Sequence, residues 1–410
     1  MTELVIDRLG HRGDGVVLQP DGQQLFVPYT LPGETVDVDL QGGTGRLKGV
    51  LTPSADRIEP VCRHFGTCGG CTLQHMAPAP YADFKRRLVV DALADRGLAP
   101  EIGETRIVPP HSRRRATFAG IMAGRHPLVG FNERGSHRLV TIDECPVVRP
   151  QLLAALPALT ALTGLIAPRK GGLDLTVTLT NGGLDVSVAG IAARDADRLR
   201  MQLIELATRF DLARLSAGGE AIVERRSVAI NIDGVAVTPS PGGFLQVSEE
   251  AEAIMGELVT AAIPDKAKRV ADLFSGVGTF ALRLARKAEI LAIEGEGGAV
   301  AALDQAARGM TGRHRITTEK RDLARRPLIE KELEKVDAVV FDPPRAGAAE
   351  QSQWLARSKV PTIVAVSCNP ATLSRDLRIL VDGGYRIESV TPVDQFLWSS
   401  HVEVVTVLRR

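Results

Sequence analysis

The chain has 410 residues, 44% of them hydrophobic, which is enough to fill several cores and predicts more than one domain. The formal net charge of +1 excludes a chain-wide attraction to polyanions, so any nucleic-acid surface is expected to be local, and the aromatic content of 4% argues against extended base-stacking platforms. No run of eighteen apolar residues occurs, and the charged, glycine-rich start is unlike a signal peptide, so we expect a cytoplasmic protein.

Residues 1–58 alternate short β-like runs with glycine turns, a pattern typical of a small barrel. The runs read LVIDRL, GVVL, QLFVPYT, ETVDVDL and GRLKGVLT. Barrels of this size often bind oligonucleotides, but a structural appendage gives the same pattern. The strands alone therefore leave the role of this segment open.

The next segment carries a cysteine cluster. Four of the five cysteines lie in the first 145 residues: Cys62, Cys68, Cys71 and Cys145. Clustered cysteines in a cytosolic protein suggest metal binding or catalysis before disulfides. Three close thiolates and a remote one can complete a tetrahedral site for zinc or for an iron–sulfur cluster. Gly69 and Gly70 would let the backbone approach a bulky cluster.

The middle of the chain, up to about residue 230, contains a helical pattern that stops at Gly97, then β-rich segments with one further helical pattern at residues 192–210. Two basic runs interrupt it, Lys85–Arg87 and Arg113–Arg115. Runs of this kind are often just solvated. With an RNA substrate, however, we expect them to contact phosphates.

After Pro239 the pattern changes to alternating buried strands and helices, which predicts a parallel α/β sheet through to the C-terminus. In VADLFSGVGTFALRLA a strand is followed by a turn with Gly276 and Gly278, where a ligand can approach the backbone. Glu294, at the end of the next predicted strand, could accept hydrogen bonds from ribose hydroxyls.

Two further acidic residues follow predicted strands, Asp322 and Asp342. A dinucleotide site would look similar, but the glycine spacing is not G-x-G-x-x-G. The series of acidic strand ends suits S-adenosylmethionine better than a nicotinamide cofactor.

The fifth cysteine, Cys368, stands in VAVSCNPATLSRDL at the end of an apolar strand and before a predicted helix. A free cysteine is commonly inert packing. At the carboxyl edge of such a sheet, at a helix N-terminus whose dipole favours a thiolate, Cys368 is instead expected to be a nucleophile.

A thiolate beside a methyl donor suggests pyrimidine C5 chemistry, because addition of sulfur to C6 makes C5 nucleophilic. After methylation a general base must remove the C5 proton so that the thiolate can leave. Glu403, in the apolar run HVEVV, is the candidate base, although it could be a surface residue of an edge strand, and His401 is expected to orient rather than catalyse.

These motifs together resemble the bacterial RNA uracil-C5 methyltransferases, which make 5-methyluridine, and the likeness runs over nearly the whole chain. The matching stretches are CRHFGTCGGC, DECP, DLFSGVGTF, FDPPRAG, SCNPATLSRDL and HVEVV. The resemblance implies that Cys368 is the nucleophile and Glu403 the proton acceptor. It also implies an S-adenosylmethionine site lined by Gln246, Phe274, Gly276, Thr279, Glu294, Asp322 and Asp342.

The barrel is similar to the TRAM domain of some members, and its combination with four cysteines is most similar to the enzymes that act on 23S ribosomal RNA. That likeness implies an OB-like TRAM barrel at 1–58 that binds RNA, a β-rich central domain at 59–235 whose four cysteines hold a [4Fe-4S] cluster, and a Rossmann-like S-adenosylmethionine methyltransferase domain at 236–410. Zinc stays an alternative metal.

The sequence departs from the family at two places. Ser248 stands where the family usually has asparagine, and QFLWSSHVE lacks the usual proline, histidine and threonine before the glutamate. We expect these changes to affect substrate positioning more than chemistry. A tRNA-specific enzyme, a cytosine-C5 methyltransferase and a non-catalytic RNA-binding or ribosome-assembly protein remain alternatives.

Overall fold

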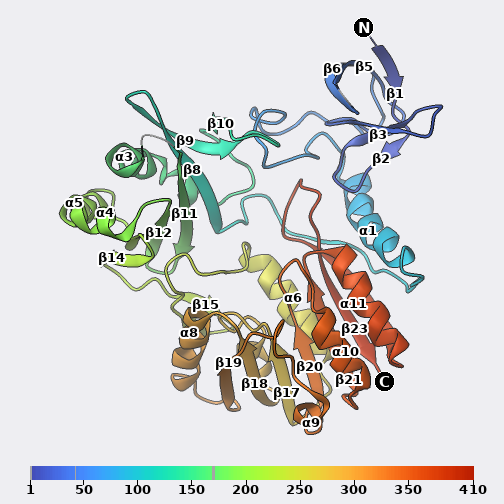
Figure 1. The fold of residues 1–410 in the computed structure, drawn as a ribbon, viewed down its shortest axis with the longest axis vertical. Helices are drawn as coiled ribbons and strands as arrows, with labels where there is room; N and C mark the ends of the chain where they lie inside the picture. Colours follow the sequence, from blue (N-terminus) through green and yellow to red (C-terminus); the bar gives the residue numbers. More distant parts are fainter. Residues whose placement is uncertain (1, 42, 169–170) are drawn as a thin grey trace.

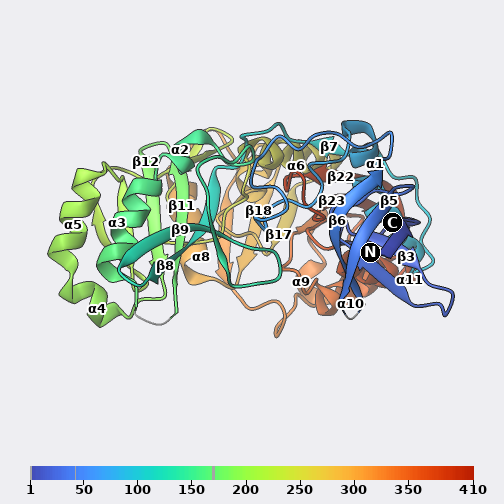
Figure 2. The ribbon, with the colours of Figure 1, turned by 90° about the horizontal axis from the view of Figure 1, so that it is seen from above.

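The computed structural model describes residues 2–41, 43–168 and 171–410. Its strands form a six-stranded sheet, a seven-stranded sheet, an eight-stranded sheet and a two-stranded hairpin. In Figure 1 the N-terminal sheet lies above the C-terminal one and the middle sheet lies to the side. Figure 2 shows the N-terminal and middle sheets at opposite ends of the molecule.

The N-terminal sheet has the strand order β1-β5-β6-β4-β3-β2. Its strands are β1 (Thr2–Val5), β2 (Arg8–Leu9), β3 (Gly15–Leu18), β4 (Gln24–Val27), β5 (Thr35–Gln41) and β6 (Thr44–Thr52). They coincide with the five predicted β runs, the first of which divides into β1 and β2. Apolar side chains on one face, including Val17, Val27 and Val36, build a small core.

The middle sheet has the order β10-β9-β8-β11-β12-β13-β14. Its elements are β8 (Arg115–Ala123), β9 (His126–Asn132), β10 (Leu139–Thr141), α2 (Pro150–Leu153), α3 (Leu156–Ile166), β11 (Leu173–Thr180), β12 (Gly183–Ala189), α4 (Ala193–Arg198), α5 (Arg200–Arg209), β13 (Arg214–Ala217) and β14 (Glu220–Glu224). The helical pattern predicted at 192–210 is present but broken at Leu199. The sequence prediction missed α3, because it is apolar on most sides and lacks an amphipathic period.

The C-terminal sheet has the order β19-β18-β17-β20-β21-β23-β22-β7. Its strands are β7 (Arg106–Ile107), β17 (Arg269–Leu273), β18 (Glu289–Glu294), β19 (Ile316–Lys320), β20 (Ala338–Phe341), β21 (Thr362–Ser367), β22 (Arg386–Asp394) and β23 (Glu403–Arg409), and the separate hairpin is β15 (Ile230–Ile232) with β16 (Val235–Val237). The strands from β19 to β21 are parallel, as predicted. The prediction is wrong for β23, which runs antiparallel to both of its neighbours, β21 and β22, because the short loop between β22 and β23 is no crossover.

Helices cover both faces of this sheet. They are α1 (Pro78–Ala94), α6 (Glu249–Ala262), α7 (Ala281–Leu284), α8 (Gly297–Arg308), α9 (Glu330–Leu333), α10 (Ala349–Arg357) and α11 (Pro370–Asp382). One core joins α6 and α8 to the sheet, and the opposite core joins α1, α10 and α11 to it. None of the helices in the described part of the chain is long and apolar enough to cross a bilayer.

The strand order reverses between the neighbours β17 and β20. After β17 the chain adds β18 and β19 on one side, and it then returns to add β20 and β21 on the other side. In open α/β sheets, ligands bind beyond the carboxyl ends of the strands at such a switch point. The ends of β17, β18, β20 and β21 therefore mark the edge at which a site is expected.

Candidate active site and a cysteine-lined cavity

The turn after β17 leaves open space for a ligand at one glycine and not at the other. Gly276 has φ +53°, and a Cβ built on it would meet no atom within 4 Å. Gly278 has φ +102°, and a Cβ there would lie 2.5 Å from Leu303 of α8. Gly276 thus lets a ligand approach the backbone, whereas Gly278 lets the turn pack on a helix. Phe274, with φ 60°, and the half-buried Thr279 belong to the same turn.

Glu294, the last residue of β18, faces this turn. Its Oε2 accepts the backbone N–H of Gly276 at 3.0 Å, and its Oε1 accepts that of Glu296 at 2.7 Å. Asp322, beyond β19, is more exposed, and its Oδ1 accepts the N–H of Ala324 at 3.0 Å. The structure therefore brings Glu294 to the glycine turn and places Asp322 at the rim of the same edge.

Four other side chains converge where β20, β21 and β23 meet. Asp342 follows β20, Cys368 follows β21 and Glu403 begins β23. Ser367 pairs with Val404 across the antiparallel ladder, so Cys368 and Glu403 lie at the same end of adjacent strands. Gln246, from the loop before α6, donates from Nε2 to Asp342 Oδ2 at 3.2 Å. The predicted nucleophile, the predicted base and two predicted cofactor contacts, Gln246 and Asp342, are therefore neighbours.

Sequence reasoning missed one member of this group, Gln395. Its Nε2 donates to Glu403 Oε1 at 2.7 Å and to Gln246 Oε1 at 2.9 Å. Gln395 lies in the loop after β22, where no periodic pattern or motif marks it. The sole signal was its position shortly before the candidate base.

The electrostatics of the group are set by burial. Burial and the nearby carboxylate of Asp342 raise the pKa of Glu403, against the Gln395 hydrogen bond and Arg345. Burial also raises the pKa of Asp342, against the Gln246 hydrogen bond. A carboxyl group with a raised pKa in a catalytic cleft is suited to take up a proton.

The expectation that Cys368 is stabilised as a thiolate by capping a helix is wrong for the structure as it stands. The N-cap of α11 is Asn369, whose side chain accepts the N–H of Ala371 at 3.2 Å. Burial, followed by the carboxylates of Glu403 and Asp342, raises the pKa of the Cys368 thiol to about 11, and Arg345 opposes this only partly. Burial, with the two carboxylates adding to it, therefore disfavours the Cys368 thiolate in this structure.

A cavity of about 950 Å³ opens onto Cys368. One wall comes from the catalytic side and the other from the N-terminal sheet and α1. Its polar and reactive lining includes Arg345, Cys368, His401, Arg8, His11, Arg12 and Arg87. His401 is exposed here, with Nε2 3.5 Å from Arg345 Nη2. We call this cavity the catalytic cleft.

The two basic runs do not form the predicted phosphate-binding surface. Lys85 is fully buried and paired with Asp394 at 2.8 Å, and Arg114 is 3% exposed and paired with Glu252 at 2.6 Å. Arg115 donates to the backbone carbonyls of the loop before Gln246. These cations already have protein partners, so the prediction is wrong for them. Arg87, 68% exposed and on the wall of the catalytic cleft, stays a predicted phosphate contact.

Ser248, the departure from the family pattern, is the N-cap of α6. It is fully buried, and its Oγ accepts the N–H of Ala251 at 3.3 Å. Serine and asparagine are both favoured N-caps, so this exchange preserves the start of the helix that follows Gln246.

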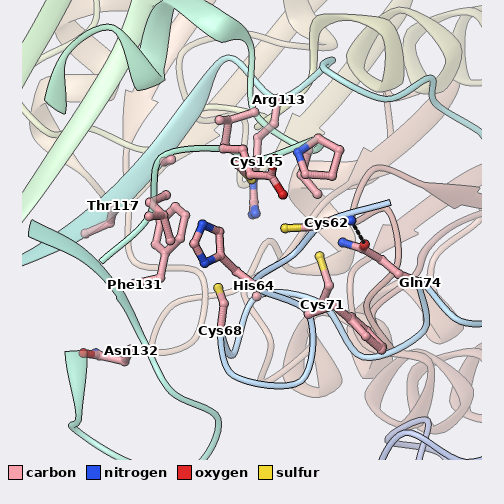
Figure 3. A pocket seen from close by; sticks show the side chains of 18 of the residues that line it. Cys62, His64, Cys68, Cys71, Gln74, Arg113, Thr117, Phe131, Asn132 and Cys145 are labelled. Carbon is pink, nitrogen blue, oxygen red and sulfur yellow. Dashed lines mark hydrogen bonds between the residues drawn. The ribbon is translucent and has the colours of Figure 1, made fainter. Parts of the chain in front are cut away.

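The four remaining cysteines line a second cavity, of about 420 Å³ (Figure 3). Cys62, Cys68 and Cys71 come from the irregular segment before α1, and Cys145 comes from the loop after β10. Burial raises the pKa of Cys71 to about 12, and the other three thiols contribute to the rise. The structure therefore brings together Cys71 and Cys145, which have 73 residues between them in the chain.

Two features of this cavity bear on what it could hold. Within residues 2–41, 43–168 and 171–410, no group of three or more His, Cys, Asp or Glu side chains meets at the spacing for a metal ion. The donor set is four thiols around one space, and thiolates are the ligands of iron–sulfur clusters. Arg113, half-buried, also lines the cavity and supplies a positive charge beside them.

Of the two glycines expected to let the backbone approach a cluster, Gly69 packs against β9 and only Gly70 lines the cavity. A Cβ on Gly69 would lie 2.8 Å from the carbonyl oxygen of Asn132, so Gly69 lets the segment approach β9. Its N–H donates to that oxygen at 3.0 Å. Gly70 is the glycine that faces the cavity, with its Cβ position 3.6 Å from Cys68 Sγ.

The model of the family described as tRNA (Uracil-5-)-methyltransferase matches residues 190–410. An uncharacterized RNA methyltransferase of Rhizobium meliloti is 49% identical over 99% of each chain. The 23S rRNA (uracil(1939)-C(5))-methyltransferase RlmD of Chromohalobacter salexigens is 35% identical over 99% of this chain and 89% of its own. The crystal structure of Pyrococcus abyssi tRNA (uracil-54, C5)-methyltransferase with S-adenosyl-L-homocysteine has the same fold, with a TM-score of 0.76, 22% identity and 99% coverage of both chains.

Proposed function

Because the chain belongs to the RNA (uracil-5-)-methyltransferase family, which transfers a methyl group from S-adenosylmethionine to C5 of uracil in RNA, we propose that Cys368 and Glu403 carry the covalent chemistry. The observation that supports this most is their placement at one end of the paired strands β21 and β23, beside Asp342, with Cys368 on the wall of the catalytic cleft.

Cys368 attacks as the thiolate. Its Sγ forms a bond to C6 of the uracil, and the electron pair of the C5–C6 double bond makes C5 nucleophilic. The cofactor supplies an electrophilic methyl group on a sulfonium, which C5 takes. Glu403 then accepts the C5 proton, the double bond forms again and the C6–S bond breaks, which restores the Cys368 thiolate. One proton is released overall.

The cofactor is proposed to lie over the glycine turn. Gly276 leaves the backbone open there, Phe274 and Thr279 flank it, and Glu294 and Asp322 lie at the ends of the next two strands. Gln246 and Asp342 are then between the cofactor and Cys368. Carboxylates at successive strand ends are suited to ribose hydroxyls and to a positively charged ligand.

The substrate is proposed to be 23S ribosomal RNA. The 35% identical relative that is named for 23S rRNA supports it, and so does the presence of four cysteines together with an N-terminal sheet. The alternative is tRNA, which the name of the family and the 22% identical structure favour. The target base must be unstacked in either case, because C6 must reach Cys368.

We assign the chain to three parts: a TRAM-like, RNA-binding sheet at 1–58, a central domain at 59–235 and a methyltransferase domain at 236–410. Support for the RNA-binding role of the first part comes from Arg8, His11 and Arg12, which line the same cavity as Cys368. The N-terminal sheet would then hold the RNA on both sides of the flipped base.

The cysteine-lined cavity is proposed to hold a [4Fe-4S] cluster through Cys62, Cys68, Cys71 and Cys145. Four thiols that face one cavity support a thiolate-ligated centre, and the cationic Arg113 would balance part of its charge. Its role is proposed to be structural, because the methylation steps transfer no electrons.

The test uses RNA that carries 5-fluorouridine, in which the C5 proton is replaced and release is blocked. The enzyme and cofactor should form a covalent complex that survives denaturation, and peptide mapping should find the RNA on the peptide that contains Cys368. Mapping of 5-methyluridine in RNA from cells that lack the gene should show the loss in 23S rRNA. An adduct at another residue, or a loss confined to tRNA, would contradict the corresponding assignment.

A further inference from the structure

A continuous line of amide groups joins the two acidic residues of the candidate active site. Asp342 accepts from Gln246, Gln246 accepts from Gln395, and Gln395 donates to Glu403. Gln246, Gln395 and Glu403 are 5%, 3% and 4% exposed, so water competes little for these bonds. The chain of contacts spans four segments: the loop before α6, the end of β20, the loop between β22 and β23, and the start of β23.

The orientation of both amides is fixed by the acceptors at the two ends. An ionised carboxylate only accepts hydrogen bonds, so each amide must turn its NH2 group toward an acid. Gln246 then presents Oε1 to Gln395. The Nε2 group of Gln395 donates one hydrogen bond to Gln246 and one to Glu403. Flipping Gln395 would place its oxygen against two other oxygens, Gln246 Oε1 and Glu403 Oε1.

The backbone next to Gln395 is held by a buried ionic group. Asp394, the last residue of β22, is paired with Lys85 of α1 at 2.8 Å and accepts from the Tyr81 hydroxyl. Its Oδ1 also accepts the N–H of Phe396 at 3.1 Å. Tyr81 in turn accepts the N–H of Trp398 at 2.7 Å. The residues on both sides of Gln395 are therefore fixed to α1, so its side chain has little freedom to leave Glu403.

The bond to Gln395 distinguishes the two oxygens of Glu403. Oε1 is occupied by an N–H donor, and within the described residues no side chain or backbone group donates to Oε2. A donor to the carboxylate lowers the pKa of Glu403, against the rise caused by burial and by Asp342. The hydrogen bond thus favours the ionised form of Glu403, against burial and Asp342, and leaves one oxygen available for the proton.

We propose that Gln395 is a positioning residue for proton removal: it holds Glu403 through Oε1, so that Oε2 accepts the C5 proton of the methylated adduct. The proposal rests on the proposed role of Glu403 as the base. The bond that breaks is C5–H, its electron pair forms the C5–C6 double bond, and the thiolate of Cys368 leaves from C6. Gln395 takes no part in the transfer of the methyl group.

The test separates adduct formation from proton removal. RNA with tritium at C5 of uridine is mixed with enzyme and cofactor in a single turnover, from about pH 6 to about pH 9. Denaturing gels report the covalent adduct, and tritium in water reports proton removal. In Gln395→Leu, adduct formation should stay within about threefold of the wild type. Tritium release near pH 7 should fall by about 10- to 100-fold, with its pH midpoint raised by about one to two units.

The sign of the pH effect follows from the hydrogen bond. Removing a donor raises the pKa of Glu403, so the ionised form is lost at a higher pH, and raising the pH should restore release. Glu403→Gln should accumulate adduct at every pH, because no carboxylate remains to titrate. Gln351→Leu is the matched control: Gln351 is a buried glutamine of α10 that bonds only to the backbone of Leu328. It should lose stability without any change in the pH midpoint.

The outcomes distinguish a wrong role for Gln395 from a wrong role for Glu403. If Gln395→Leu releases tritium with the wild-type rate and midpoint, or loses adduct formation and release equally with an unchanged midpoint, the positioning role of Gln395 is wrong. If Glu403→Gln releases tritium at the wild-type rate, Glu403 is not the base and the proposed function itself must be revised at that residue.

Discussion

The two cysteine sites of this protein are assembled in different ways. Cys368 lies at the end of a buried strand, and its neighbours Asp342 and Glu403 occupy the ends of the adjacent strands. The cysteine-lined cavity takes all of its thiols from irregular segments that lie between sheets. The first site is a consequence of sheet topology, whereas the second depends on long-range closure of loops.

Backbone hydrogen bonds connect the two sites. The segment with Cys68 and Cys71 bonds to β9 through Gly69, and the N–H groups of Thr72 and Leu73 donate to the carbonyl of Trp398 at 2.8 and 3.0 Å. Trp398 belongs to the loop that precedes Glu403. The cavity is thus attached to the catalytic side by backbone hydrogen bonds.

The largest expected effect is the loss of turnover when Cys368 is replaced. Cys368→Ala should lower turnover by at least about 10⁴-fold, since the nucleophile is lost, and should leave the melting temperature nearly unchanged, because only a small, half-buried side chain is truncated. Turnover assays with unmodified RNA, together with thermal unfolding, check both parts. Activity within tenfold of the wild type would make Cys368 a packing residue.

The second effect concerns the cavity. Cys145→Ser should reduce the iron of protein purified without air from about four atoms per chain to a small fraction of that, because the clamp between two remote segments is lost. Iron and sulfide analysis measures this, and thermal unfolding should show a lower melting temperature. Binding of S-adenosylhomocysteine should persist. Stoichiometric zinc in place of iron in the wild type would contradict the proposed cluster.

The sequence predicted the catalytic edge well, because buried apolar runs end at Leu273, Glu294, Phe341 and Ser367 and parallel strands place their carboxyl ends together. Residue type and position then identified Cys368 and Asp342. The loop that holds Gln395 has no such regularity. Its partners are 149 and 8 residues away, and only the folded chain shows that they meet.

For Lys85 and Arg114 the sequence prediction failed in a different way: it expected accessible cations, and the structure buries them. A charged run is normally solvated, and nothing in the local sequence of Lys85 or Arg114 signals burial. The carboxylates that make burial possible, Asp394 and Glu252, are 309 and 138 residues away. Buried ion pairs need partners, and a sequence pattern does not show where distant partners lie.

The third effect concerns the buried ion pair that connects α1 to the end of β22. Lys85→Met leaves Asp394 buried without its cation, so the free energy of unfolding should fall by about 3–5 kcal/mol. Urea unfolding measures the change. The double variant Lys85→Met/Asp394→Asn should recover part of the loss, since no unpaired charge remains. Arg87→Met on the same helix is exposed and should change stability by less than about 0.5 kcal/mol.

The smallest effect tests which cations meet RNA. Arg87 lies on the wall of the catalytic cleft and its Nε donates to Asp83 at 2.8 Å, so part of its charge is already balanced. Arg87→Gln should weaken RNA binding by about two- to fivefold at physiological salt, and should reduce the slope of log affinity against log salt by about one. Fluorescence anisotropy at several salt concentrations measures both quantities.

The control for Arg87 is Arg198→Gln, which removes an arginine of α4 that is 75% exposed and lies outside the lining of the catalytic cleft. If charge alone decided the affinity, both variants would weaken binding equally, because each lowers the net charge by one. If the cleft holds the RNA, only Arg87→Gln should change the salt slope, since counterions are released only where a phosphate is contacted. Equal slopes for the two variants would remove the last of the predicted phosphate contacts from the basic run of α1.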